Sequence, residues 1–299
     1  MNTFSKCQAH ARFGWPLFSA IIRSVPLAAC LVLFSSCTAL LSNVVIEPSV
    51  TNLQRQQDVD LVCEGAASYL LMLDSLVADN PTSRTLLLIA TKAYSGTAEA
   101  LRACDAPADR IMAMSGKARN YGKRLLATRL PMDTPHSPEF EKALERQSKN
   151  DAELLFWGGF GWLSWITQQQ GSPAALADLI VVEKIMARVL SLDETVEQGS
   201  PHLFFGALYG AKPVIAGGNP DKSRFHFDRA LEISDRRFLI IQTTFAQTYA
   251  RMTMNQALHD SLLAEVIDFD INDAPEHALS NQIARRTAQA LLDENYFGD

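Results

Sequence analysis

The sequence lacks the short motifs that mark common catalytic and cofactor-binding sites. It contains no Gly-x-Ser-x-Gly, no glycine-rich loop that ends in Lys-Ser or Lys-Thr, and no His-Glu-x-x-His. No side chain can therefore be named as a nucleophile with its base, which argues against a hydrolytic enzyme. We predict that the protein is not an enzyme and that it binds no cofactor.

Metal-site spacings are also missing. The segment that begins at Asp268 opens like a calcium loop, but such loops need Gly at the sixth position and Glu at the twelfth. Asp273 and Leu279 occupy those positions. His226 and Asp228 are two residues apart in a predicted helix, so they face different directions. The sequence predicts no bound metal.

Basic residues do not exceed acidic ones in this chain. Its 27 Lys and Arg stand against 33 Asp and Glu, which gives a net charge of −6. Nucleic-acid binding needs clustered Lys and Arg at the phosphates, so nucleic acid is excluded as a partner. The basic residues that are present include three in the first 36 positions, where no acidic residue occurs.

The N-terminal segment has the order of a signal peptide. The basic residues precede an apolar run over 25–34, which is too short for a membrane span of roughly 20 residues. Phe-Ser-Ser-Cys follows at 34–37 and resembles a bacterial lipobox, although Phe34 stands where Leu is commonest. We predict a signal peptide over 1–36 and a lipidated tether over 37–52, with lipid on Cys37. The alternative is an ordinary secretory signal in which this cysteine is incidental.

Cleavage before Cys37 would leave 24 basic and 33 acidic side chains, a net charge of −9. No basic cluster lies beside the tether, so lipid would be the only membrane anchor. Thr38 follows the cysteine, whereas Asp there would resemble an inner-membrane retention signal. We therefore predict a periplasmic protein that is anchored to the outer membrane.

Only two further cysteines would remain in the mature chain, because Cys7 and Cys30 leave with the signal. Cys63 and Cys104 lie in adjacent predicted helices. In an oxidising compartment they can form a disulfide. The alternative is two buried thiols that act as small apolar side chains.

The rest of the chain has helical periodicity and no convincing strand alternation. Apolar residues recur at spacings of three and four, and Pro, Gly, Asn and Asp separate the segments. We predict an all-α protein with one helical domain over 53–299. Its expected helices cover 59–77, 84–104, 107–130, 139–149, 152–168, 172–192, 202–214, 221–234, 238–252, 255–268 and 276–292.

The helix expected over 152–168 is unusual because it combines aromatic residues with three glycines. Each glycine inside a helix costs about 1 kcal/mol relative to alanine, so a compensating gain is expected. One reading is close approach of a neighbouring helix. The other is space for a ligand beside aromatic side chains, which supply large apolar walls. For this second reading the predicted cavity residues are Trp157, Trp162, Trp165, Phe204 and Tyr209.

Several helix pairs share a rhythm that is typical of degenerate tetratricopeptide-like repeats. The segments 173–193, 219–233 and 263–270 end in similar ways, although none matches the repeat consensus strictly. Stacking such antiparallel hairpins into a solenoid would bury the apolar face that each leaves exposed. The alternative is a helical bundle without repeats.

Seven blocks keep their order across the C-terminal half: Leu155–Trp162, Pro201–Tyr209, Gly217–Arg224, His226–Phe227, Arg229–Leu231, Ala278–Ala284 and Ala288–Leu292. As a set these blocks resemble one family, the T components (TatT) associated with tripartite ATP-independent periplasmic (TRAP) transporters. The Asn80-Pro81 and 94–96 segments extend the resemblance weakly towards the N-terminus.

This resemblance implies a periplasmic lipoprotein with cryptic tetratricopeptide repeats that is a partner of the substrate-binding P subunit of the transporter. It also implies a channel or cavity that passes a hydrophobic small ligand, and it is compatible with homo-oligomers. The alternative function is an outer-membrane scaffold or assembly lipoprotein that uses its helical repeats to bind proteins.

Overall fold

Side-chain caps set the starts of many helices in the computed structural model, which describes residues 52–169 and 171–298. Ser83, Ser137, Ser172 and Asn219 each accept a hydrogen bond from the backbone N–H three residues later. This bond satisfies a donor of the first turn that would otherwise be free. Proline follows three of these caps, at the position where its missing N–H costs nothing.

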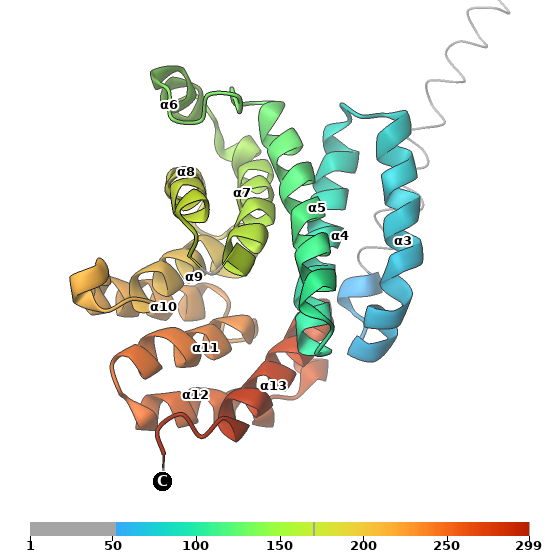
Figure 1. Ribbon diagram of the computed structural model, residues 1–299. Coiled ribbons are helices and arrows are strands. Elements are labelled where there is room, and N and C mark those ends of the chain that lie inside the picture. Colours follow the sequence, from blue (N-terminus) through green and yellow to red (C-terminus); the bar gives the residue numbers. More distant parts are fainter. Residues whose placement is uncertain (1–51, 170, 299) are drawn as a thin grey trace, which may run out of the picture. The chain divides into compact units, whose positions relative to one another are not determined.

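The described residues form helices and no strand, which confirms the all-α prediction (Figure 1). Most predicted boundaries agree with the structure to within a few residues. The tetratricopeptide-like repeats stay a prediction. The helices are α3 (Val59–Asp79), α4 (Arg84–Ala103), α5 (Ala108–Ala127), α6 (Pro138–Glu145), α7 (Ala152–Ile166), α8 (Pro173–Leu192), α9 (Val196–Gly210), α10 (Pro220–Ile233), α11 (Ile240–Phe245), α12 (Gln256–Asp268) and α13 (Ala278–Asp293).

Three predicted helices differ from the observed elements. The helix expected over 202–214 is α9, which ends at Gly210, and Val214–Ala216 forms a separate 3₁₀ turn. The helix expected over 238–252 is α11 followed by a π-helical turn at Ala246–Ala250. Such π turns are rare and cannot be read from apolar periodicity, because they keep a continuous helical path. The helix expected over 139–149 ends at Glu145, and a short 3₁₀ turn at Lys149–Asp151 leads into α7.

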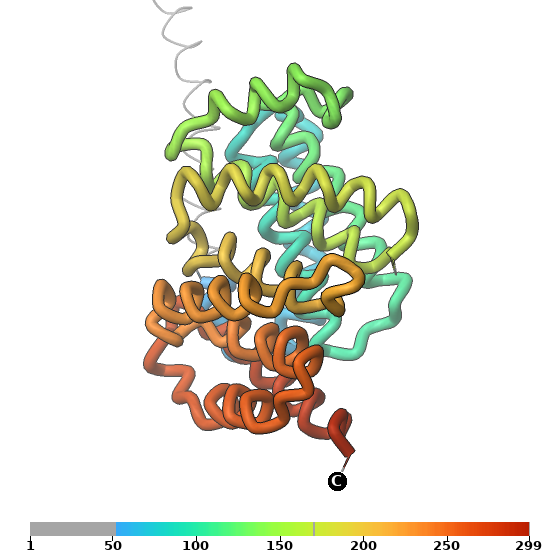
Figure 2. Tube along the Cα trace, turned by 90° about the vertical axis from the view of Figure 1, so that its left-hand side faces the viewer, coloured from blue at the N-terminus to red at the C-terminus, as the bar shows by residue number. Residues whose placement is uncertain are grey.

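Successive helices pack side by side, as α3 does with α4, α4 with α5, α7 with α8 and α9 with α10. Figure 2 shows the chain descending from α6 at the top (green), through α8 (yellow) and α10 (light orange), to α12 (darker orange) near the bottom. The last helix, α13, packs back on α3 and α4. There the two guanidinium nitrogens of Arg286 lie 2.8 Å from the two carboxylate oxygens of Asp60. The C-terminal helix thus contacts the first helices of the array.

A disulfide joins the first two helices of the array. Cys63 lies on α3, Cys104 directly follows α4, and their sulfur atoms are bonded. The structure thereby decides between the two readings of these cysteines in favour of a disulfide. Around it, Val59 and Val62 of α3 pack with Leu101 of α4 and with Ile283 of α13.

A single carboxylate ties three helices together. Asp74 of α3 accepts hydrogen bonds from the Tyr94 hydroxyl of α4 at 2.9 Å, from the Tyr121 hydroxyl of α5, and from Lys117 Nζ at 3.0 Å. Burial alone would raise the pKa of Asp74, but these hydrogen bonds outweigh it and lower the pKa. Burial and the same carboxylate raise the pKa of Tyr121 to about 12.

Asp74→Asn is expected to lower the free energy of unfolding by about 1–3 kcal/mol at neutral pH, because the amide carries no negative charge and places an NH2 donor where the second carboxylate oxygen accepts from Lys117. A lowered folded-state pKa gives stability that is present above the unfolded value of about 4 and is lost as pH falls through the folded value. The gap between wild type and variant should therefore shrink below about pH 4. Urea unfolding at several pH values measures it, and a gap independent of pH would contradict this account.

Candidate functional site

Two of the three glycines of the aromatic helix α7 pack closely against α5, and the third, Gly159, faces Met186 of α8. A β-carbon built on Gly158 would lie 2.5 Å from the Leu126 side chain, and one on Gly161 would lie 2.7 Å from the Ala118 carbonyl oxygen. Gly122 of α5 has the reciprocal contact, since its β-carbon would meet the Gly158 carbonyl oxygen at 2.7 Å. Close helix approach, the first of the two readings, therefore accounts for these glycines.

The aromatic side chains of α7 leave the helix in two directions. Trp162 is 1% exposed, its indole N–H donates to Asp178 of α8 at 2.8 Å, and Lys123 lies over its ring. Trp165 carries the Arg119 guanidinium 4.0 Å from its ring centroid, and Arg119 also pairs with Asp178. Trp162 and Trp165 thus share one polar boundary between α5, α7 and α8.

Trp157 faces a different group of charges. Its indole N–H donates to Glu197 at 2.6 Å, and Lys92 Nζ of α4 lies 5.0 Å from the ring centroid. Lys92 also pairs with Glu153 at 2.6 Å and with Glu197 at 3.4 Å. A half-buried tryptophan with a cation on its face and an anion on its N–H therefore joins α4, α7 and α9.

Glu197 reaches this position through a strained backbone. Glu197, Gln198 and Gly199 have φ values of 46°, 62° and 79°, so three consecutive residues are left-handed at the start of α9. The two residues that are not glycine cost about 1–3 kcal/mol each, which the surrounding contacts must offset. Glycine suits position 199 for two reasons. It adopts the left-handed conformation without strain, and a β-carbon there would lie 3.2 Å from the Ile233 side chain of α10.

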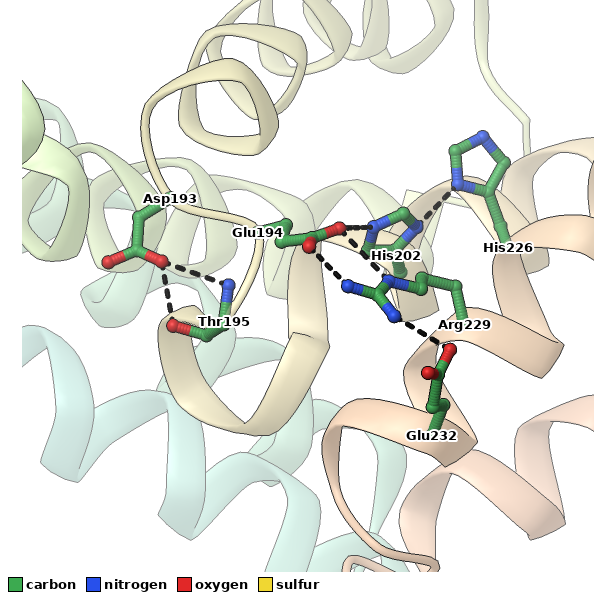
Figure 3. A network of polar contacts seen from close by, with 7 residues as sticks. All are labelled: Asp193, Glu194, Thr195, His202, His226, Arg229 and Glu232. Atoms are coloured by element: carbon green, nitrogen blue, oxygen red, sulfur yellow. Dashed lines mark hydrogen bonds and ion pairs between the residues drawn. The ribbon is translucent and has the colours of Figure 1, made fainter.

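A polar network includes the linker between α8 and α9, residues 193–195, and joins it to α10 (Figure 3). His202 is 4% exposed; its Nε2 donates to Glu194 at 3.0 Å, and its Nδ1 lies 2.9 Å from Nδ1 of His226. Arg229 bridges Glu194 and Glu232. Hydrogen bonds from Arg229 and His202 lower the pKa of Glu194 to about 2.

His226 links this network to an aromatic cluster on α9 and α10. Its ring stacks on Phe205 and Tyr209, with centroid distances of 5.4 Å and 6.0 Å. Burial lowers the pKa of His226 to about 4, with further lowering by the charges of His202 and Lys222. One proton between the two facing Nδ1 atoms lets one ring donate while the other accepts.

All five predicted cavity residues belong to or pack against one hydrophobic cluster around α7 and α8. Trp162 and Phe204 are buried within it, and Trp157, Trp165 and Tyr209 pack on it. The indole N–H groups of Trp157 and Trp162 point to the separate boundaries described above. A cavity among them stays a prediction. Lipidation of Cys37 falls outside the described residues.

A pocket of about 360 Å³ lies elsewhere, where the described chain begins. Residues of α3 form most of its wall. Leu53 and Gln56, which precede α3, and Thr97 of α4 also contribute. None of the five predicted cavity residues lines it. Within residues 52–169 and 171–298, no cluster of three or more His, Cys, Asp or Glu side chains is arranged to hold a metal ion.

A comparison of the sequence with known protein families identifies the kind of protein. A model of the TRAP transporter T-component family (TAtT) matches residues 55–297, nearly the whole described part of the chain. The chain belongs to this family. No curated protein sequence matches it. As a T component, the protein is an accessory part of a TRAP transport system.

Several contacts in this T component could not be read from its sequence. His202 and His226 are 24 positions apart and no motif links them in the sequence, yet they face each other. Glu197 and Lys92 carried no signal at all, because an acidic residue after a helix and a lysine within one are common. A Gly199-Ser200-Pro201 start was visible for α9, but not the left-handed residues before it.

Proposed function

We propose that this T component is a periplasmic lipoprotein, anchored through Cys37 to the outer membrane, that binds the substrate-binding P subunit of a TRAP transporter. Family membership over residues 55–297 carries the proposal. The Cys63–Cys104 disulfide supports an oxidising compartment such as the periplasm. Helix hairpins with apolar faces suit a binding role in which the protein contributes surface and no chemistry.

The ligand part of the proposal is that a hydrophobic small molecule passes beside Trp157, Trp162, Trp165, Phe204 and Tyr209. Signal cleavage removes Trp15, so these three tryptophans would be all that the mature chain contains. Its intrinsic emission therefore reports on this cluster alone. We expect an uncharged apolar ligand to shift the emission, and Trp157→Phe to reduce the shift. Emission unchanged by every apolar ligand that binds would remove this part of the proposal.

Binding to the P subunit is tested directly. The mature protein in detergent, and the same chain as Cys37→Ala in buffer, are each titrated with the purified receptor of a TRAP system encoded nearby. We expect saturable binding by both, because the anchor and the binding surface are separate. Co-purification of outer-membrane assembly proteins without any receptor would instead favour the scaffold function.

Cys37→Ala also tests the anchor. The variant is expected to move from the membrane fraction to the soluble periplasmic fraction, because a chain without lipid loses its only predicted membrane attachment. Its thermal unfolding should equal that of the wild type, since the cysteine lies outside the helical array. Fractionation is followed by immunoblotting, and a variant that stays with the membranes would refute the lipobox assignment.

A further inference from the structure

The pocket beside α3 has the size of a small-molecule site. Its volume of about 360 Å³ lies within the roughly 300–1,000 Å³ of known ligand pockets. The pocket is open to solvent. It lies beside α3, the first helix of the array, which packs on α4. Leu61, Val62, Gly65, Ala66 and Tyr69 give the α3 part of its wall.

The lining of this pocket carries no charge. The four polar side chains among the nine that line it are Asn52, Gln56, Tyr69 and Thr97. Gln56 uses its carbonyl oxygen to accept from two backbone N–H groups of the following turn. A carboxylate or ammonium group in such a wall would lose its hydration without gaining a counter-charge. The lining therefore selects for an uncharged and mainly aliphatic ligand.

Tyr69 adds a specific polar feature. Its hydroxyl oxygen is buried and has no hydrogen-bond partner among the described residues. Burial also raises the pKa of this phenol, so it stays a neutral donor. A buried donor without a partner is costly, and an acceptor supplied by a ligand would remove that cost.

Gly65 leaves room in the wall. A β-carbon built on it would have no heavy atom within 4 Å, although the residue lies in the middle of α3. Glycine at this place costs helix stability and supports no close helix contact, in contrast to Gly158 and Gly161. The space that it leaves is part of the pocket.

From these observations we infer that the α3 pocket binds an uncharged aliphatic molecule with a hydrogen-bond acceptor, such as an ester or a fatty alcohol, beside Tyr69. The site is separate from the aromatic cluster of α7 and does not rest on the proposed function. The Tyr69 hydroxyl, which solvent does not reach in the unbound protein, turns towards the pocket and donates its proton to the acceptor of the ligand. The ligand chain lies against Leu61, Val62 and Ala66.

The test uses the full mature chain as Cys37→Ala, so that its own lipid cannot occupy the pocket. Fluorescence of N-phenyl-1-naphthylamine reports binding, and methyl decanoate and decanoate compete for the site at about pH 7, where decanoate is ionised. We expect methyl decanoate to displace the probe at least about tenfold more tightly than decanoate. Equal displacement by the two would overturn the inference.

Two variants locate the site. Gly65→Leu fills the pocket and should weaken methyl decanoate by about tenfold or more, whereas Gly96→Leu, at an exposed and open position of α4, should leave it unchanged. Tyr69→Phe should weaken the binding of methyl decanoate roughly three- to tenfold, which corresponds to the loss of one hydrogen bond. Unfolding curves confirm that each variant folds.

If Gly65→Leu and the wild type bind methyl decanoate with equal affinity, the ligand binds elsewhere and the pocket proposal is refuted. An ester-induced shift of tryptophan emission that persists in Gly65→Leu would support the aromatic cluster, while loss of probe displacement in the same variant would still support the pocket. Loss of binding in Gly65→Leu with tryptophan emission unchanged throughout supports the pocket and removes the aromatic cluster. Probe displacement and tryptophan emission thus test the α3 pocket and the aromatic cluster independently.

Discussion

Replacement of both Cys63 and Cys104 by alanine is expected to lower the free energy of unfolding by about 4 kcal/mol. The disulfide closes a loop of 41 positions, and the loss of chain entropy in the unfolded state accounts for a value of this size. The effect is large because ordinary domains have a net stability of only about 5–15 kcal/mol. Guanidinium unfolding of the Cys37→Ala chain, with and without the two substitutions, measures it.

Thiol titration supplies the control for this prediction. With residues 1–36 removed, as the proposed signal cleavage would do, the Cys37→Ala chain has only Cys63 and Cys104, so it should show no free thiol even when unfolded. A reducing agent should lower the stability of this chain and leave the double-alanine variant unaffected. Two free thiols in the oxidised, unfolded chain would show that the pair does not form.

Gly161→Ala has the second large expected effect, a loss of about 1–3 kcal/mol. Its β-carbon would lie 2.7 Å from the Ala118 carbonyl oxygen of α5 and 2.7 Å from the Thr91 side chain of α4. Neither contact can be relieved without moving backbone or a buried residue, so overpacking exceeds the gain of about 1 kcal/mol in helix propensity. Thermal and urea unfolding measure the change.

Gly116→Ala is the matched control because Gly116 also lies within a helix of this group and has open space around it. Here the propensity gain acts alone, and stability should rise by up to about 1 kcal/mol. Gly122→Ala, on the same helix but against Gly158, should instead destabilise. A similar rise in all three variants would mean that α5 and α7 lie farther apart than described.

Helix positions were predictable from this sequence because their signals are local. Ser172-Pro173 and Asn219-Pro220 each place a cap next to a proline, and the capping bonds form as expected. Apolar spacing in α3 likewise gave its bounds to within two residues. The π turn after α11 was missed, because its one-residue shift leaves apolar periodicity almost intact.

The site was less predictable because it depends on which helices meet. Glycines within α7 indicated either a close helix or a ligand, and only the position of Gly122 on α5 separates these readings. The contact between His202 and His226 joins two helices through a linker whose left-handed residues leave no mark in composition. The α3 pocket depends on Leu53 and Gln56, which lie before the helix and carry no pattern.

The return of α13 to α3 has a consequence for cooperativity. Stacks of helical hairpins usually fray from their ends, because a terminal unit has a neighbour on one side only. Here the disulfide joins α3 to α4, and α13 packs on both through the apolar contacts around Ile283, so the first and last units each have a second neighbour. A pull applied through the proposed lipid on Cys37 would enter at α3 and be shared with the C-terminal helix. The array should therefore resist mechanical load as one body.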